Sequence, residues 1–306
     1  MKPTLHRLAP VLMLALAGGA LWVMQRELQA YNFHAIIRGL GDISRGRLIL
    51  ALMLTMASYV LLTGYDVLAL RYIRRPLPYG KIALASFLGY VFSYNVGLSI
   101  LGGSAIRYRL YSAWGLSAIE IAKVIACCTV AFWLGVFTLG GLALLLEPPA
   151  ILSSLNLPVA PARLLGVVLL MLVGVYLWWG RVRTSPLRLR RWELLLPSVP
   201  LSLAQIALSA VDWALAGAVC YLLLPASQPL PYVEFLGIFL LAQVLGVISH
   251  VPGGIGVFET IILLLLSPAL PAPSVVGALI AYRGIYYLFP LMVAMALLAA
   301  YELTRR

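Results

Sequence analysis

Charged residues are scarce in this sequence. Asp, Glu, Lys and Arg make up only 10% of the 306 residues, whereas a soluble globular chain has about 25%. Hydrophobic residues make up 63%, and the mean hydropathy is +1.00. A soluble protein of this size could not bury so much apolar surface in one core. The composition therefore predicts an all-α polytopic membrane protein and excludes a large soluble catalytic domain.

Cysteine is also rare, and its spacing indicates no chemistry. Cys127 and Cys128 are adjacent, and Cys220 lies in another apolar run. Thiols without a CxxC or metal-ligand spacing behave as small hydrophobic residues. The HExxH, GxSxG and P-loop motifs are missing from the sequence as well. We therefore expect no metal, no cofactor and no enzymatic activity.

Acidic residues are outnumbered 10 to 22 by Lys and Arg, which gives a net charge of +12. The basic residues stand in short loops between apolar runs, a pattern typical of cytoplasmic loops beside anionic headgroups and not of nucleic-acid binding. The largest clusters lie at 71–81 and 181–191, and smaller groups lie near both termini and at 107–109. Placing them all on one side predicts cytoplasmic N- and C-termini. The expected partners are membrane phospholipids.

A helix of about 20 residues crosses a bilayer. Nine apolar runs are long enough to cross it or to enter it. They are 8–24, 48–69, 82–101, 118–146, 163–180, 200–224, 234–249, 255–267 and 275–301. Simple alternation would put the two largest basic clusters on opposite faces. The conflict disappears if residues 82–117 and 234–267 each return to the face from which they entered. We therefore predict one integral-membrane domain over residues 1–306, with six full spans and two oppositely oriented re-entrant hairpins.

Residues 25–47 differ from the apolar runs. Apolar side chains recur there at helical spacing among polar ones, which predicts a short amphipathic helix and loop on the outer membrane surface. Its four arginines argue against that side. They are Arg26, Arg38, Arg45 and Arg47.

Each predicted hairpin contains a glycine pair where a helix is expected to break. The pairs are Gly102-Gly103 and Gly253-Gly254, the second preceded by Pro252. Proline removes a helical hydrogen bond, and glycine relaxes the backbone. Non-helical backbone at membrane depth is tolerated where it is buried in protein or lines a cavity. Opposed broken helices indicate the binding site of a transporter.

Arg283 is the clearest candidate for a functional residue. It lies about eight residues into a span, which is roughly 12 Å deep at the helical rise. An arginine there costs at least roughly 2.5–3.5 kcal/mol unless it is paired or hydrated. It is expected either to hold a lipid phosphate in a wet cavity or to form a structural ion pair with Asp212 or Glu259. Tyr286 lies one turn on, and Pro290 cannot donate to its carbonyl.

Three further candidates lie either in the middle of a predicted span or beside the Gly253-Gly254 break of the second hairpin. Asp212 stands mid-span and could be a counter-ion, a proton site or a site for a cationic headgroup. Glu259 follows the break, where free amides at a helix start favour an anion. His250 could titrate near neutral pH or simply cap a helix.

The first hairpin supplies two arginines and a nearby acid. Arg107 and Arg109 follow the glycine pair and could bind phosphate, or anchor the helix at headgroup level. Asp66 lies near the inner end of its span and is expected to reach the interface or to pair with Arg71 or Arg74.

Three segments resemble the signatures of one protein family. They are SYNVGLSILGGSAIRYRLY at 93–111, HVPGGIGVFE at 250–259 and AYRGIYYLFP at 281–290. Over nearly its whole length the chain is similar to the integral-membrane domain of the lysyl-phosphatidylglycerol synthetase (multiple peptide resistance) proteins, most of all to stand-alone bacterial members. The resemblance adds weight to six of the residues above. They are Asp66, Arg107, Arg109, Asp212, Glu259 and Arg283.

This resemblance implies a flippase-like phospholipid translocase of the bacterial inner membrane. The cargo would be an anionic or aminoacylated phospholipid such as lysyl-phosphatidylglycerol, moved between leaflets. Nothing in the sequence resembles the synthase half of two-part members, so a separate lipid-modifying enzyme is a candidate partner. Two alternatives stay open: a non-transporting membrane scaffold or accessory protein, and a secondary transporter of a small solute.

Overall fold

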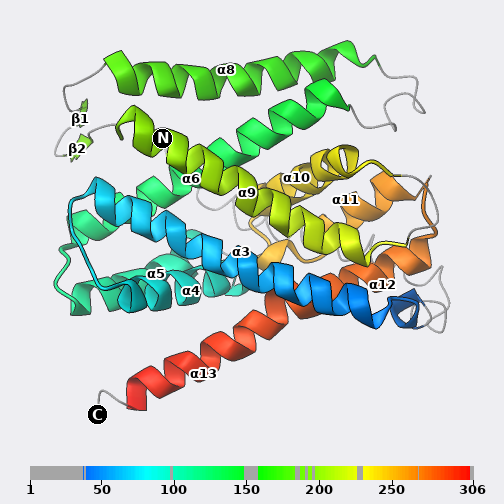
Figure 1. Cartoon of the computed structure of the whole chain (residues 1–306), viewed down its shortest axis with the longest axis horizontal. Helices are drawn as coiled ribbons and strands as arrows, with labels where there is room; N and C mark the ends of the chain where they lie inside the picture. The colour runs from blue at the N-terminus through cyan, green and yellow to red at the C-terminus, as the bar shows by residue number, and fades with distance from the viewer. Residues whose placement is uncertain are drawn as a thin grey trace, which may run out of the picture.

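Long apolar helices make up most of the computed structural model (Figure 1). The structure describes residues 37, 39–96, 99–147, 158–182, 187–189, 192–194, 197–225, 230–267 and 269–303. Five helices in these ranges are long and apolar enough to cross a membrane. They are α3 (Arg45–Tyr72), α6 (Ala118–Leu146), α8 (Ala160–Val182), α9 (Val199–Leu223) and the rod formed by α12 (Ala272–Tyr282), the π-helix η2 (Arg283–Leu288) and α13 (Phe289–Leu303). The chain is thus an all-α polytopic membrane protein, as predicted.

Two helical hairpins enter the bundle from opposite ends. The first consists of α4 (Tyr79–Val96) and α5 (Ser99–Ala113), which pack against each other. The second consists of α10 (Tyr232–Ile248) and α11 (Val257–Leu266), joined through the 3-10 turn η1 (Pro252–Gly254). In Figure 1 the first hairpin lies at the end where the chain terminates, and the second lies at the other end. Helix α4 contacts η1, so the two tips meet inside the bundle. The predicted pair of opposed hairpins is confirmed.

The first predicted span, 8–24, lies outside the described residues, and so does most of the predicted amphipathic segment 25–47. Helix α3 begins at Arg45, where the Ser44 side chain accepts a hydrogen bond from the Arg47 amide. The Arg47 guanidinium donates to the Leu224 carbonyl at the end of α9. A Cβ built on Gly39 would lie 2.9 Å from Ser274 Cα, so this part of the chain runs against the start of α12.

The second hairpin breaks where the sequence predicts. Gly253, Gly254 and Gly256 have φ angles of 61°, 61° and 83°, in the left-handed region that favours glycine. The first hairpin does not break at its glycine pair. Gly102 and Gly103 lie within α5, which begins at Ser99, whereas α4 ends at Val96.

Close packing explains the glycine at position 103. A Cβ built there would lie 1.9 Å from Ser93 Oγ and 2.3 Å from the Gly89 carbonyl oxygen on α4. Small residues of this kind let membrane helices approach closely. The glycine thus sets the spacing between the arms of the hairpin, and the prediction of a break at Gly102-Gly103 is wrong.

We expect Gly103→Ala to lower the free energy of unfolding in detergent by about 1–3 kcal/mol, the usual cost of overpacking. Gly174→Ala is the matched control, because nothing lies within 4 Å of a Cβ built at that position of α8. Equal stability of the two variants in a thermal or denaturant titration would contradict the packing role of Gly103.

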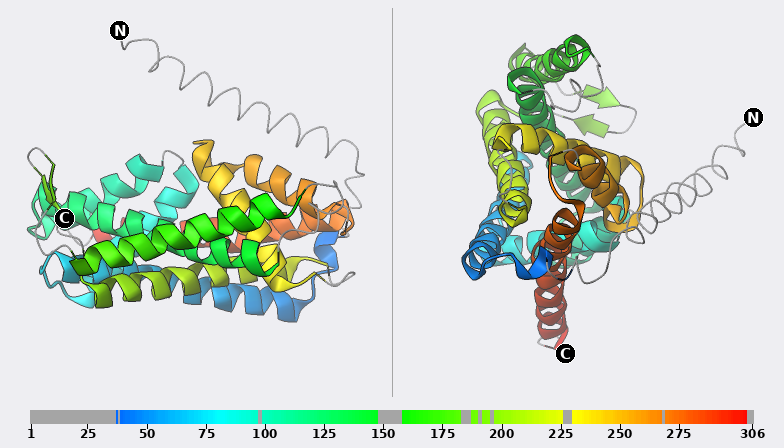
Figure 2. Two further views of the ribbon diagram at one scale, coloured as in Figure 1. Left: turned by 90° about the horizontal axis from the view of Figure 1, so that it is seen from above. Right: turned by 90° about the vertical axis from the view of Figure 1, so that its right-hand side faces the viewer.

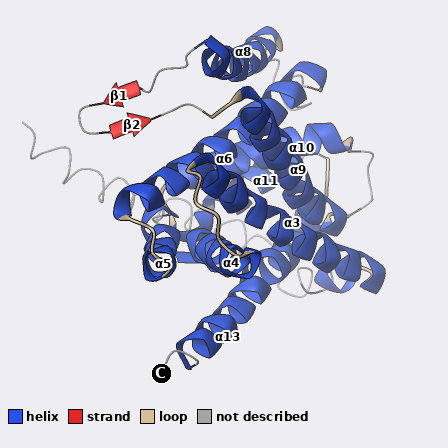
Figure 3. Ribbon diagram, turned by 60° about the vertical axis from the view of Figure 1, so that its left-hand side comes forward, coloured by secondary structure: helices blue, strands red, loops and turns tan. Residues whose placement is uncertain are grey.

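Arg71 lies in the last turn of α3 and Arg181 in the last turn of α8. Both helices terminate at the end of the bundle where α4, α6 and α9 begin (Figure 1). Arg75 Nε lies 2.5 Å from Glu120 Oε1 and joins the α3–α4 loop to the start of α6. After α8 the chain forms a short antiparallel hairpin of β1 (Leu187–Leu189) and β2 (Trp192–Leu194), drawn in red in Figure 3. The described parts of the two largest clusters thus share one end of the molecule, as the charge argument requires.

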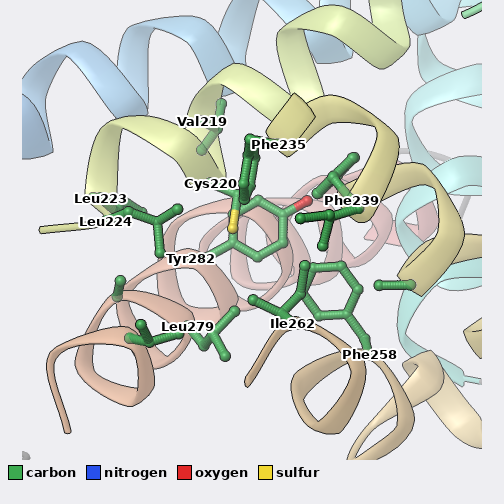
Figure 4. Packing of buried hydrophobic residues seen from close by; sticks show 14 of the residues in the cluster. Val219, Cys220, Leu223, Leu224, Phe235, Phe239, Phe258, Ile262, Leu279 and Tyr282 are labelled. Carbon is green, nitrogen blue, oxygen red and sulfur yellow. The ribbon is translucent and has the colours of Figure 1, made fainter. Parts of the chain in front are cut away.

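The buried core is apolar and the outside of the bundle is apolar too. In Figure 4 Cys220, Phe235 and Tyr282 point toward one another from α9, α10 and α12. All three cysteines are buried free thiols, as expected of small hydrophobic residues. Viewed along the long axis (Figure 2, right), α8 lies at the edge of the bundle, where it exposes Leu164, Met171 and Trp178. Such a surface suits lipid acyl chains.

Candidate functional site

Arg283 lies where the second hairpin meets the α12–α13 rod. Its Nε donates to Glu259 Oε1 at 2.6 Å, and its Nη1 donates to the Gly253 carbonyl at 2.7 Å. The guanidinium also lies over the Tyr287 ring, with its carbon 4.4 Å from the ring centroid. The ion-pair hypothesis is therefore confirmed for Glu259, whereas Asp212 is not its partner. The arginine is tied to the broken backbone of the hairpin tip.

Glu259 has a second role, at the start of α11. Its Oε2 accepts a hydrogen bond from the Gly256 amide at 2.7 Å. The left-handed Gly256 precedes the helix and leaves this amide without a helical partner. One carboxylate thus caps the helix and pairs with Arg283, so the structural part of the prediction for Glu259 is confirmed.

The Arg283 guanidinium keeps one donor group free. Its Nη2 atom is buried and makes no hydrogen bond. The side chains of Arg283 and Glu259 are 17% and 13% exposed, so the pair is partly sheltered and not sealed. A guanidinium presents five N–H donors, and a bound oxygen acceptor could satisfy the free nitrogen.

Pro290 shapes the backbone around this arginine. Because it has no N–H, the Tyr286 carbonyl loses its helical donor, and the Tyr59 hydroxyl donates to that carbonyl at 3.1 Å. The segment from Arg283 to Leu288 is a π-helix, a form that is frequent at functional sites. The tip of the first hairpin lies close by, since a Cβ on Gly253 would be 3.1 Å from the Tyr94 carbonyl oxygen.

Asp212 is buried in a network of hydroxyl groups. Ser58 Oγ donates to its Oδ1 at 2.8 Å, and the Tyr65 hydroxyl donates to its Oδ2 at 3.2 Å. Ser58 also shares a 2.9 Å hydrogen bond with the Tyr286 hydroxyl. Within the described ranges, no arginine or lysine forms an ion pair with Asp212.

Arg107 and Asp66 form a buried ion pair in the first hairpin. Arg107 Nε and Nη2 lie 3.0 Å from Asp66 Oδ1 and Oδ2, and Tyr111 donates to Oδ1 at 2.8 Å. Both charged side chains are buried. The partner of Asp66 is therefore Arg107, and the alternative in which Asp66 pairs with Arg71 or Arg74 is wrong. Gly89 makes the pair possible, because a Cβ there would be 3.0 Å from the Arg107 guanidinium carbon.

Arg109 and His250 lie apart from these buried groups. Arg109 is 63% exposed and its Nη2 lies 2.6 Å from Glu302 Oε1, which fits the anchor interpretation. His250 is exposed with a φ of 56°, and its Nδ1 lies 2.7 Å from the Ile248 carbonyl oxygen. His250 thus caps the end of α10, which is one of the two roles that the sequence left open.

Comparison with known proteins gives the family. The model of the lysylphosphatidylglycerol synthase TM region matches residues 11–294. The chain belongs to this family. It is 42% identical over 306 residues to the uncharacterized protein slr0712 of Synechocystis, covering 98% of this chain and 93% of that protein. It is 34% identical over 267 residues to the inner membrane protein YbhN of Escherichia coli, covering 86% and 83%.

A two-part relative shows where the match ends. The chain is 25% identical over 277 residues to the phosphatidylglycerol lysyltransferase of Staphylococcus aureus. The aligned region covers 90% of this chain but only 32% of that enzyme. The family that the sequence motifs resemble is thus confirmed, and the likeness is to a part of the lysyltransferase.

In this member of the lysylphosphatidylglycerol synthase TM family the two hairpins carry related charge pairs. Arg107 on α5 pairs with Asp66 on α3, and Glu259 on α11 pairs with Arg283 on the α12–α13 rod. In each pair, a charged residue on the second helix of the hairpin contacts the opposite charge on a long helix. Three hydroxyl groups that complete the polar networks were not predicted from the sequence, those of Ser58, Tyr65 and Tyr111. The only signal for them is polar side chains in otherwise apolar runs.

Proposed function

We propose that this protein moves a phospholipid between the leaflets of the bacterial inner membrane. The observation that carries the proposal is the Arg283–Glu259 pair at the meeting point of two opposed broken hairpins. Hairpin tips of this kind form substrate sites in transporters. The free Nη2 of Arg283 offers a hydrogen bond to a phosphate oxygen.

The other parts of the arrangement fit a lipid cargo. The phosphate would lie against Arg283 and the hairpin tip, while the acyl chains stay in the bilayer beside the apolar outer surface of the bundle. The candidate cargo is an anionic or aminoacylated phospholipid such as lysyl-phosphatidylglycerol, in keeping with the family. We propose that the chain does not itself transfer the aminoacyl group, and that a separate enzyme supplies any modified lipid. The basic end of the bundle would face the cytoplasm, with both termini.

The test is leaflet exchange in liposomes that contain the purified protein and a fluorescently labelled phosphatidylglycerol. A membrane-impermeant quencher reports the label in the outer leaflet. We expect exchange well above that of protein-free liposomes. Folded protein that gives no exchange with several headgroups would overturn the proposal and favour a scaffold.

A further inference from the structure

Asp212 differs from two other acids inside the bundle, Asp66 and Glu259. Asp66 and Glu259 each form an ion pair with an arginine, whereas Asp212 has only hydroxyl partners among the described residues. It lies near the middle of α9, with Ser58 and Tyr65 of α3 on its two oxygens. A buried charge is normally paired, or the group is neutralised. A carboxyl surrounded by hydroxyls is suited to holding a proton.

We propose that Asp212 is a proton-binding site that couples proton movement to lipid translocation. The inference rests on the proposed function, and it narrows the cargo to a phospholipid with one negative charge. One proton on Asp212 balances one phosphate charge, so the pair crosses the membrane without moving net charge through the potential. The proton comes from water on one side and returns to water on the other.

The hydroxyl chain can hold the proton in both states. As a carboxylate, Asp212 accepts from Ser58 and Tyr65, and Ser58 accepts from Tyr286. As an acid, Asp212 donates to Ser58, which then donates to Tyr286 across the 2.9 Å contact. Hydroxyl groups permit this reversal because each can donate and accept.

Tyr286 connects the proton site to the lipid site. It lies three residues after Arg283 in the same π-helix. Its hydroxyl is bonded to Ser58, and its backbone carbonyl accepts from Tyr59. When the Ser58–Tyr286 hydrogen bond reverses its direction, the π-helix that holds both Tyr286 and Arg283 is therefore affected, and with it the position of Arg283 against Glu259.

The surroundings of Asp212 contain titratable groups but no counter-charge among the described residues. Among the described residues, the titratable groups that interact with the carboxyl or with its hydroxyl partners are phenols and a thiol, and no ion pair joins the carboxyl to a lysine or arginine. These groups are Tyr59 and Tyr65 of α3, Tyr94 of α4, Tyr286 of η2, Tyr282 of α12 stacked on Tyr286, and Cys128 of α6 beside Tyr65. Asp212 is the one carboxyl among these groups, and phenols and thiols hold their protons far more tightly than a carboxyl does, so Asp212 is the proposed proton carrier.

The first measurement does not depend on transport. Infrared spectroscopy of the detergent-solubilised protein during a pH titration follows the C=O band of a protonated buried carboxyl. We expect this band in the wild type and in Glu302→Gln, the matched exposed carboxyl control, and its loss in Asp212→Asn. An unchanged band in Asp212→Asn would overturn the proton site.

The second measurement places a pH gradient across the exchange liposomes, with the membrane potential clamped at zero. One proton coupled to one phosphate predicts a steady-state leaflet ratio of about tenfold per pH unit, since each unit is a tenfold step in proton concentration. Asp212→Asn should distribute the lipid evenly, and Glu302→Gln should behave as wild type. An even distribution in the wild type would overturn the coupling.

Two outcomes separate the possible failures. If the wild type shows no exchange at all, the proposed function fails, and the infrared band alone decides whether Asp212 holds a proton. If Asp212→Asn does not fold, Ser58→Ala replaces it. That variant keeps the carboxyl but cuts its link to Tyr286, so the band should shift and the leaflet ratio should fall toward one. A leaflet ratio equal to that of the wild type would contradict the coupling.

Discussion

Replacing Asp66 by leucine is expected to lower the free energy of unfolding by about 3–5 kcal/mol, the cost of leaving one member of a buried ion pair alone. Both carboxylate oxygens of Asp66 bind Arg107, and the arginine lies in the interior of the first hairpin. Without Asp66 the guanidinium has no acidic partner among the described residues and lies over the Tyr90 ring, with its carbon 4.3 Å from the ring centroid. Denaturant unfolding in detergent measures the loss.

The double variant Asp66→Leu/Arg107→Met separates an unpaired charge from general damage. Apolar replacement of both partners of a buried pair is often neutral, so the double variant should recover most of the lost stability. Glu302→Gln breaks the exposed pair with Arg109 and should change stability by at most about 1 kcal/mol. A double variant as unstable as Asp66→Leu would contradict the account of this pair.

Removing Arg283 is expected to abolish lipid exchange. One hydrogen bond from a charged group is worth about 1.5–3 kcal/mol, so loss of the phosphate contact alone predicts at least about a tenfold fall in the exchange rate. Arg283→Lys should also be slow. A lysine keeps the charge but cannot bind Glu259, the Gly253 carbonyl and a third acceptor in one plane.

The matched control for Arg283 is Arg109→Ala, because Arg109 is also an arginine in an ion pair but lies on the surface. It should exchange lipid at the wild-type rate. Thermal unfolding of all variants checks that they are folded. Full activity of Arg283→Ala, or equal losses in both variants, would argue against a lipid site at the hairpin tips.

The architecture could be predicted because it depends on composition and on where basic loops stand. The basic residues at 71–81 and 181–191 were expected on one face of the membrane, and that arrangement requires two re-entrant hairpins. The second break was predicted from the glycines at 253 and 254, which have positive φ angles in the structure. The first break was misplaced because glycine also serves close packing. At Gly103 the neighbouring helix decides its role, and a single sequence does not show which helix that is.

The partners of buried charges could be predicted only in part. Glu259 was one of two acids expected to pair with Arg283, the other being Asp212, and the sequence did not decide between them. Asp66 was expected to reach the interface or to pair with a nearby arginine, whereas its partner Arg107 lies 41 residues away. Ser58 and Tyr65 stand out in the sequence merely as polar residues in an apolar run. Pairing across helices depends on their rotation and register, which short-range patterns do not fix.

The most direct test of the central claim is photo-crosslinking of phosphatidylglycerol with a photoactivatable headgroup in the exchange liposomes. The account predicts crosslinks to the second hairpin tip at 250–259, which are lost in Arg283→Ala and kept in Arg109→Ala. Crosslinks confined to the lipid-facing side of α8, at equal yield in the wild type and both variants, would contradict a phosphate site between the hairpins.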